Sequence, residues 1–166
     1  MDKRIRFVRR EDAEAIAEIY NYYVVNTEVS FEEEAVSAEA MAGRIESKIV
    51  KYPWIVYETD GKVLGYAYVG AWKERSAYRH TVEDTIYVKE SERGKGIGRK
   101  LFEALMEEVG RNKEFHAVIG VIALPNERSA RLHERNGFAK AAHFREVGYK
   151  NKKWIDVGYW ERVMEG

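Results

Sequence analysis

Three closely spaced glycines, in the segment Arg93-Gly94-Lys95-Gly96-Ile97-Gly98, constrain the fold of this chain more than any other feature. The β-rich run at 85–88 before them predicts a strand, and apolar residues at 97, 101, 105 and 109 predict a helix after them. Glycines at such a junction leave several backbone N–H groups at the positive end of a helix dipole, where phosphate binds well. Lys95 and Arg99 add positive charge beside those amides. The segment therefore predicts a phosphate-binding turn between a strand and a helix.

Two common glycine motifs do not match this turn. A P-loop has Gly-x-x-x-x-Gly-Lys followed by Ser or Thr, and no hydroxyl residue follows these glycines. The dinucleotide fingerprint Gly-x-Gly-x-x-Gly opens a βαβ unit, whereas here the spacing is Gly94-x-Gly96-x-Gly98, in mid-chain. A tight turn without a ligand is the remaining alternative, and the flanking basic residues argue against it.

The remaining β-rich and apolar-periodic segments predict one domain spanning 1–166, with the element order β-α-α-β-β-β-α-β-α-β-β. Ser37 is expected to cap the second helix, and Asn126 is expected to cap the last one, which ends at Asn136-Gly137. The apolar run 117–123 predicts a strand buried on both faces. We therefore expect an α/β fold in which helices flank a mixed, mostly antiparallel sheet. The predicted strands cover 5–9, 54–58, 63–69, 85–88, 117–123, 138–147 and 154–163.

Composition excludes several classes of protein. The 166 residues carry 28 basic and 28 acidic side chains, and this balance argues against a general nucleic-acid binder. The longest apolar run falls short of the roughly 18 residues that span a bilayer, and the N-terminus lacks the apolar core of a signal peptide. The chain has no cysteine, which excludes disulfides, thiolate metal sites and a cysteine nucleophile. We expect a cytoplasmic protein without a metal.

The chain resembles a known family. Arg93-x-x-Gly96-x-Gly98 matches the Arg/Gln-x-x-Gly-x-Gly/Ala signature of the GCN5-related N-acetyltransferases (GNAT), and 126–138 resembles their second conserved segment. The predicted element order is also that of the family. Within it, the chain resembles the phosphinothricin and methionine sulfone/sulfoximine acetyltransferases. That closer resemblance rests on the segments 52–54, 72–78, 81–88, 124–126 and 154–158.

The resemblance implies acetyl-CoA as the cosubstrate, with its pyrophosphate held by the glycine turn. It also implies that the strand residues 86–88 pair with the amide-rich pantetheine arm, as a strand pairs with a peptide. Asn126 and Ser129 lie on the helix face that borders this arm in the family, although Asn126 is also a good helix cap. The expected cofactor-binding residues are Ile86, Tyr87, Val88, Arg93, Gly94, Lys95, Gly96, Ile97, Gly98, Arg99, Asn126 and Ser129.

Acetyl transfer to an amine requires removal of a proton, and a positioned carboxylate accelerates this by roughly 10²–10⁴. Glu83 matches the position of the base in the subfamily that the chain resembles. Without that resemblance, the interpretation would be a solvated carboxylate at a strand edge. His133 stands where many members of the broad family have a tyrosine acid. Its imidazole is a candidate to protonate the leaving thiolate or to accept the amine proton, with a packed or capping histidine as the alternative.

The loop before Glu83 suggests an anionic substrate. Lys73 and Arg75 are expected to hold a carboxylate and a phosphinate or sulfone, although a solvated charged loop is the alternative. Phe31 and Tyr78 are expected to cover the aliphatic part of the substrate. Asp84 and Thr85 complete the candidate contacts, but Asp84 should point mostly away if Glu83 points in, because neighbouring strand residues face opposite ways.

The resulting hypothesis is an enzyme that acetylates the α-amine of a small anionic amino acid such as phosphinothricin, methionine sulfoximine or methionine sulfone. Acetylation of protein N-termini or polyamines is an alternative activity, and a non-catalytic CoA-binding sensor is an alternative of another class. Retention of Glu83 beside the glycine turn argues against the sensor. The subfamily resemblance further implies a homodimer.

Overall fold

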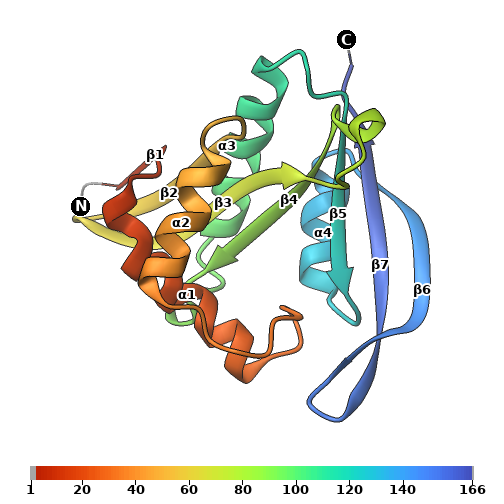
Figure 1. Ribbon diagram of the computed structural model, residues 1–166, viewed down its shortest axis with the longest axis horizontal. Coiled ribbons are helices and arrows are strands. Elements are labelled where there is room, and N and C mark those ends of the chain that lie inside the picture. The colour runs from red at the N-terminus through yellow and green to blue at the C-terminus, as the bar shows by residue number, and fades with distance from the viewer. Residues whose placement is uncertain (1–2, 166) are drawn as a thin grey trace.

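The computed structural model describes residues 3–165, and its centre is one mixed sheet of seven strands in the order β1-β2-β3-β4-β5-β7-β6 (Figure 1). The predicted element order is confirmed. The strands are β1 (Lys3–Phe7), β2 (Trp54–Thr59), β3 (Lys62–Ala71), β4 (Thr81–Val88), β5 (Ala117–Ala123), β6 (Ala139–Lys150) and β7 (Lys153–Val163). The helices are α1 (Ala13–Asn26), α2 (Ala38–Lys48), α3 (Ile97–Arg111) and α4 (Glu127–Arg135).

The helices cover both faces of this sheet. α1 and α2 pack on one face, over a core that includes Ile16, Ile45 and Trp54. α3 packs on the other face, where Leu101 and Phe102 are fully buried, and α4 lies beside β5 on that same side (Figure 1). Apolar residues on both faces of the sheet explain why β5 is a nearly continuous apolar run.

The sheet opens between β4 and β5. These neighbours are the parallel pair of the sheet, and they are hydrogen-bonded only from Thr81–Glu83 to Ala117–Ile119. Beyond this point the two strands diverge, while β5 continues to pair with β7 along its whole length (Figure 1). The second half of β4 therefore has one backbone edge without a neighbouring strand. The expected burial of both faces of β5 is wrong at Val121, which is 38% exposed because it borders this opening.

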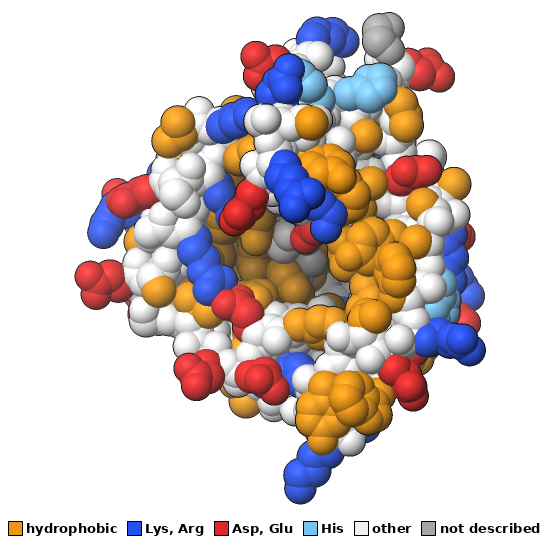
Figure 2. Space-filling view, turned by 45° about the vertical axis from the view of Figure 1, so that its right-hand side comes forward, with side chains coloured by type: hydrophobic (Ala, Val, Ile, Leu, Met, Phe, Trp, Pro, Cys, Tyr) orange, Lys and Arg blue, Asp and Glu red, His pale blue; other side chains and the backbone are white. Residues whose placement is uncertain are grey.

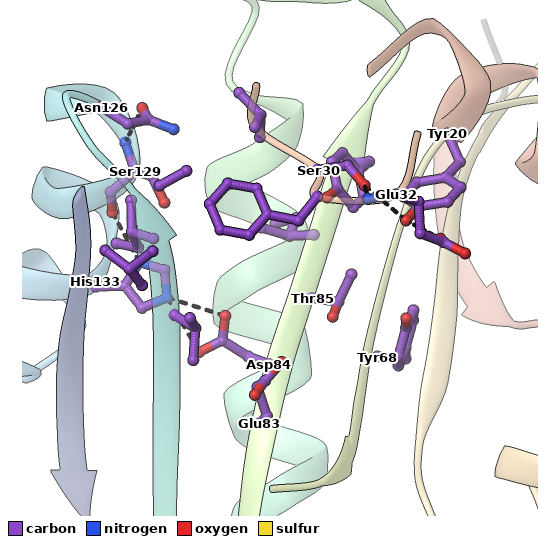
Figure 3. A pocket seen from close by; sticks show the side chains of 18 residues that line it. Tyr20, Ser30, Glu32, Tyr68, Glu83, Asp84, Thr85, Asn126, Ser129 and His133 are labelled. Atoms are coloured by element: carbon purple, nitrogen blue, oxygen red, sulfur yellow. Dashed lines mark hydrogen bonds and ion pairs between the residues drawn. The ribbon is translucent and has the colours of Figure 1, made fainter. Parts of the chain in front are cut away.

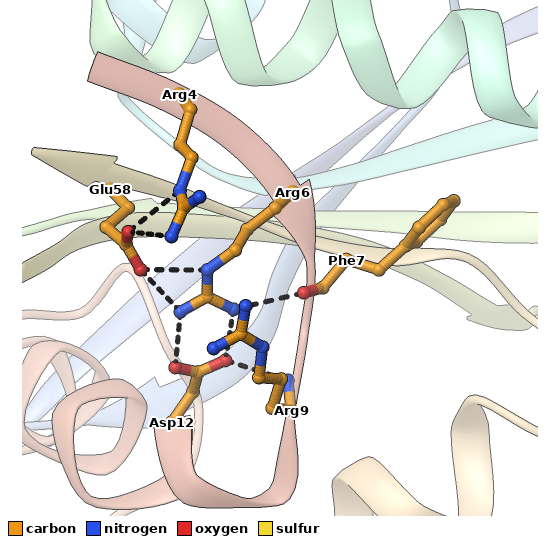
Figure 4. A network of polar contacts seen from close by, with 6 residues as sticks. All are labelled: Arg4, Arg6, Phe7, Arg9, Asp12 and Glu58. Atoms are coloured by element: carbon orange, nitrogen blue, oxygen red, sulfur yellow. Dashed lines mark hydrogen bonds and ion pairs between the residues drawn. The ribbon is translucent and has the colours of Figure 1, made fainter. Parts of the chain in front are cut away.

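A polar network fixes the N-terminal edge of the sheet to the start of α1 (Figure 4). Arg6 donates to both carboxylate oxygens of Asp12 at 2.8 Å and to Glu58 of β2 at 2.8 Å. The Arg9 N–H donates to Asp12 at 2.7 Å. Because Arg9 turns the chain into a short 3₁₀ helix (Arg10–Asp12), β1 ends at Phe7, two residues earlier than predicted.

Candidate active site

The diverging strands border two connected cavities. The inner pocket, of about 520 Å³, lies next to the point where β4 and β5 separate, and the outer groove, of about 790 Å³, runs along the glycine turn. Figure 2 shows this face with a deep hollow whose floor carries hydrophobic side chains. The residues that line both cavities are Val29, Ile86, Tyr87, Asn126 and Ser129. A molecule in the outer groove can therefore reach the inner pocket without leaving the protein surface.

The glycine turn forms one wall of the outer groove. Gly94 and Gly96 have φ values of 78° and 81°, in the left-handed region that L-residues with side chains seldom adopt. Gly96 is the N-cap of α3, and the first helical bond runs from the Lys100 N–H to its carbonyl. The amides of the first helical turn thus have no partner within the helix, and no side chain projects from Gly94, Gly96 or Gly98. This arrangement fits a diphosphate.

Basic side chains surround this groove. Arg93 and Arg99 line it as predicted, and Arg99 also pairs with Glu103 at 2.9 Å. Lys95 is not among the lining residues, and its ammonium pairs with Glu92 at 2.8 Å. Sequence reasoning missed Arg128 and Arg135 of α4, which line the opposite wall. Their seven-residue spacing on one helix, which places both on one face, was the available signal.

The expected contacts of the carrier arm also border the cleft. Ile86 and Tyr87 line both cavities, and Val88 lines the outer groove while its carbonyl accepts a hydrogen bond from the Tyr23 hydroxyl. The predicted helix cap at Asn126 is confirmed, since its Oδ1 accepts from the Ser129 N–H at 3.2 Å. Both residues of this cap lie at the junction of the two cavities.

Glu83 lies in the inner pocket on the face covered by α1 and α2 (Figure 3). Burial, and then the charge of Asp84, raise the pKa of its carboxyl to about 7, while Lys48 of α2 and Lys73 oppose this rise. Within residues 3–165 the Glu83 carboxylate makes no hydrogen bond or ion pair. A half-buried carboxylate that is free and titrates near neutrality is suited to accept a proton at neutral pH.

Strand alternation places Asp84 on the face of the sheet opposite to Glu83, and Figure 3 shows its carboxylate directed toward His133. Its two carboxylate oxygens lie 2.9 Å and 3.0 Å from Nε2 of His133. The other ring nitrogen of His133 lies 2.7 Å from the carbonyl oxygen of Ser129. Burial alone would lower the pKa of His133, but Asp84 and the Ser129 carbonyl outweigh it, so the pKa of the imidazole is raised. Both nitrogens of the predicted catalytic histidine are therefore engaged with the protein.

Other residues of the inner pocket were not predicted from the sequence, because they come together from segments that are far apart in the chain. The Tyr20 hydroxyl of α1 contacts Ser30 Oγ at 2.8 Å and donates to Glu32 (Figure 3). Glu32 in turn pairs with Arg44 of α2 at 2.6 Å. Tyr68 of β3 stands directly opposite Thr85 of β4. No local motif marks these residues, because each belongs to an ordinary helix, loop or strand pattern.

The predicted substrate residues are divided between the pocket and the loop after β3. Phe31, Asp84 and Thr85 line the inner pocket together with Glu83, whereas Lys73, Arg75 and Tyr78 are not among its lining residues. The Lys73 ammonium lies over the Trp72 ring, 4.9 Å from its centre, and Tyr78 packs edge-on against the same ring at 5.3 Å. Trp72 therefore holds this loop together as a local cluster beside the pocket.

The described residues, 3–165, contain neither a metal-binding cluster nor a helix that could span a membrane. No group of three or more His, Asp or Glu side chains in this part of the chain is placed to hold a metal ion. No helix there has the length and apolar character that crossing a bilayer requires.

Comparisons with known proteins agree with this geometry. Over 97% of its length the chain is 38% identical to phosphinothricin N-acetyltransferase of Streptomyces viridochromogenes, covering 87% of that protein. It is 35% identical, over 97% of its length and 94% of the relative, to L-methionine sulfoximine/L-methionine sulfone acetyltransferase of Salmonella typhimurium. A solved phosphinothricin acetyltransferase from Sinorhizobium meliloti, in complex with acetyl-CoA, has a TM-score of 0.94 and 34% identity, covering 100% of this chain and 91% of that one. The acetyltransferase (GNAT) domain model matches residues 5–158, and the chain belongs to the GNAT family of acetyltransferases.

Proposed function

We propose that this protein transfers an acetyl group from acetyl-CoA to the α-amine of a small anionic amino acid such as phosphinothricin, methionine sulfoximine or methionine sulfone. The observation that carries the proposal is the free Glu83 carboxylate, which stands in a pocket continuous with the groove of the glycine turn. Relatives named for these activities match nearly the whole chain. The whole chain then acts as one catalytic domain.

The outer groove has the donors that acetyl-CoA would use. The amides from Gly94 to Arg99 would hold its pyrophosphate, and the edge of β4 from Ile86 to Val88, which has no neighbouring strand, would pair with its pantetheine arm. Asn126 and Ser129 would contact the arm where the groove meets the inner pocket. When bound there, acetyl-CoA supplies the activated acetyl thioester.

Glu83 would accept the proton of the substrate ammonium, directly or through water, so that the amine has a free lone pair. Its raised pKa places the carboxyl close to the working pH, which is favourable for a general base. We assign no proton transfer to His133, because Asp84 and Ser129 occupy both of its ring nitrogens. Without a cysteine to carry the acetyl group, the transfer would be direct.

Recognition of the anionic groups of the substrate stays a prediction for Lys73 and Arg75. Lys73 is near enough to Glu83 to lower its pKa, and both residues belong to the loop that follows β3. Phe31, 45% exposed at the pocket, would cover the aliphatic body of the substrate. Tyr78 would contribute only if the loop moves toward the pocket.

One observation favours a second candidate, a polyamine acceptor. The charged side chains that line the inner pocket include the three carboxylates Glu32, Glu83 and Asp84. Two of them already have partners, since Glu32 pairs with Arg44 and Asp84 pairs with His133. One free carboxylate fits a base better than it fits a site for several ammonium groups, so the amino-acid substrate is preferred.

We further propose that the enzyme is a cytoplasmic homodimer. The β6–β7 hairpin carries exposed apolar side chains that a second copy could cover, among them Val147 at 60%, Tyr149 at 56% and Trp154 at 66% exposure. Analytical ultracentrifugation across a concentration series tests this association.

Measurement of thiol release from acetyl-CoA with a panel of amines tests the proposed function. The panel contains phosphinothricin, methionine sulfone, methionine sulfoximine, spermidine and a peptide with a free N-terminus. The anionic amino acids should give the highest kcat/KM, and Glu83→Gln should lower it by roughly 10²-fold or more. Glu107→Gln, on an exposed position of α3, is the matched control and should leave the rate unchanged. A Glu83→Gln enzyme with full activity at neutral pH would exclude Glu83 as the base.

A further inference from the structure

We propose that Asp84 is a positioning residue that holds His133 as a buried imidazolium and thereby ties α4 to β4 at the point where the cleft opens. The pairing itself is independent of the reaction. Its effect on Glu83 rests on the proposed function.

The contacts of His133 specify its protonation state. A backbone carbonyl can only accept a hydrogen bond, so the ring nitrogen 2.7 Å from the Ser129 oxygen carries a proton. A carboxylate also can only accept, so Nε2, at 2.9 Å and 3.0 Å from the two oxygens of Asp84, carries a proton as well. A ring that donates from both nitrogens is an imidazolium.

The surroundings of the Asp84–His133 pair shield it from solvent. His133 is 2% exposed and Asp84 is 8% exposed. The rings of Phe102 and Phe138 pack edge-on against the imidazole, with centres 4.9 Å and 5.0 Å away. Because charges separated from water interact strongly, neither partner can lose its charge without affecting the other.

Gly120 makes this pairing possible. A Cβ atom at this position of β5 would lie 2.4 Å from Nε2 of His133 and 3.3 Å from the Asp84 carboxylate. The side chain from α4 therefore crosses β5 through the space above Gly120 to reach β4. Ile119 and Glu83 are the last residues that β5 and β4 pair with each other, and Gly120 and Asp84 follow them directly. The ion pair thus lies at the vertex of the cleft.

The Asp84–His133 pair affects the proposed active site in two ways. His133 holds the carbonyl of Ser129, a residue that lines both cavities, so the pair fixes the wall of the cleft formed by α4. The negative charge of Asp84 also disfavours ionisation of Glu83, while Lys48 from α2 and Lys73 from the loop after β3 favour it. Asp84 thereby helps to keep the base from being permanently ionised at neutral pH.

The first test measures the wild-type protein in the absence of acetyl-CoA. ¹⁵N NMR of the imidazole rings, with the His133 signals assigned by their loss in His133→Gln, should show both nitrogens of His133 protonated at pH 7 and above. A neutral His133 ring at pH 7 would overturn the proposal. This measurement does not depend on catalysis, so it can fail while amine acetylation is confirmed, and it can succeed while no amine is acetylated.

The second test uses Asp84→Asn, which keeps the shape of the side chain and removes its charge. We expect His133 to be neutral at pH 7 in this variant, and we expect the half-maximal point on the acidic side of the kcat/KM profile to move to lower pH, because the charge of Asp84 raises the pKa of Glu83. Asp156→Asn is the matched control, because it breaks the half-exposed pair of Asp156 with His143. The control should change neither the His133 signals nor the profile.

If Asp84→Asn does not fold, the double variant Asp84→Asn/His133→Gln replaces the ion pair by two neutral amides and should recover the folded protein with the lowered acidic limb. A wild-type acidic limb in either folded variant would show that Asp84 does not act on the base.

Discussion

At the scale of single residues, Lys48 lowers the pKa of Glu83 although the two residues are far apart in the sequence. Gly70 of β3 stands directly opposite Glu83, and the Lys48 ammonium lies 3.1 Å from where a Cβ of Gly70 would be. The absence of a side chain at Gly70 therefore admits a cation next to the base. This cation lowers the pKa of Glu83 against the effects of burial and Asp84.

Lys48→Met should therefore raise the pKa of Glu83 above about 7. Activity requires the ionised carboxylate, so kcat/KM should increase as pH rises through this pKa, and the variant should need a higher pH to reach half of its maximum. The pH dependence of kcat/KM measures the shift. Lys51→Met, in the exposed turn after α2, serves as control. Identical acidic limbs in wild type and Lys48→Met would show that Lys48 has no influence on the base.

Glu83 should also lower the stability of the folded protein at neutral and alkaline pH. Its pKa is raised from 4.5 to about 7, so between these values the unfolded chain ionises first and stability falls as pH increases. Glu83→Gln should raise the free energy of unfolding by up to about 3 kcal/mol at pH 8. The gain should vanish below pH 4, where both states of the wild type are protonated. Urea unfolding at the two pH values measures it, and an equal gain at both would contradict this origin.

The sequence predicted some of these residues and not others for a physical reason. Glu83 was predicted because its position resembles that of the base in the acetyltransferase subfamily, since its local sequence alone indicates a solvated carboxylate. Asn126 is recognisable because a cap precedes a helix. Lys48, Tyr68 and Arg44 gain their positions from packing between elements, which local patterns do not encode. The pairing of Asp84 with His133 depends on the space above Gly120, which a single sequence does not reveal.

At the scale of elements, the glycine turn that begins α3 has a left-handed backbone conformation and also forms the proposed phosphate site. Gly96 adopts φ 81°, and Gly61 adopts φ 77° in the β2–β3 hairpin, far from the groove. Neither has a heavy atom within 4 Å of an added Cβ, so alanine at either site is opposed only by backbone conformation. The two positions therefore separate the cost of the left-handed backbone from the loss of a phosphate site.

Both Gly96→Ala and Gly61→Ala should destabilise the protein by about 1 kcal/mol. Only Gly96→Ala should weaken binding of CoA, by roughly tenfold or more, because relief of its strain moves the amides of the first turn of α3. Calorimetric titration with CoA and thermal unfolding of both variants measure the two effects. Unchanged CoA affinity in Gly96→Ala would place the pyrophosphate elsewhere.

Most helices and strands could be predicted from the sequence, but the residues at which they begin and end were harder to predict. Helical periodicity and caps located α2 and α4, as the Ser37 hydroxyl accepting from the Ala40 N–H at 3.0 Å illustrates. β4 begins at Thr81 rather than near Thr85, because its first residues are polar and are held by pairing with β3 and β5. Such pairing between strands is not visible in the residues of one strand.

At the scale of the whole molecule, the loop between α1 and α2 is fastened to the far edge of the sheet. The buried ammonium of Lys150, at the end of β6, donates to the Ser30 carbonyl at 2.6 Å. The Phe31 ring lies against Gly148, where a Cβ would be 2.5 Å from the ring. These contacts join segments about 120 residues apart and complete the wall of the inner pocket that Val29, Ser30 and Phe31 form.

Lys150→Met should release this loop while leaving the outer groove intact. We expect KM for the amino-acid substrate to rise several-fold with little change in KM for acetyl-CoA, since the loop residues Ser30, Phe31 and Glu32 line the inner pocket and not the outer groove. Amide hydrogen exchange should become faster at 28–32, because an ordered loop protects its amides only while it is fastened. Lys153→Met is the matched control, since the Lys153–Glu28 pair is more exposed and contributes little. Equal rises in KM for both substrates would mean that Lys150 supports the whole cleft, whereas unchanged exchange and kinetics would show that the loop holds its position without the lysine.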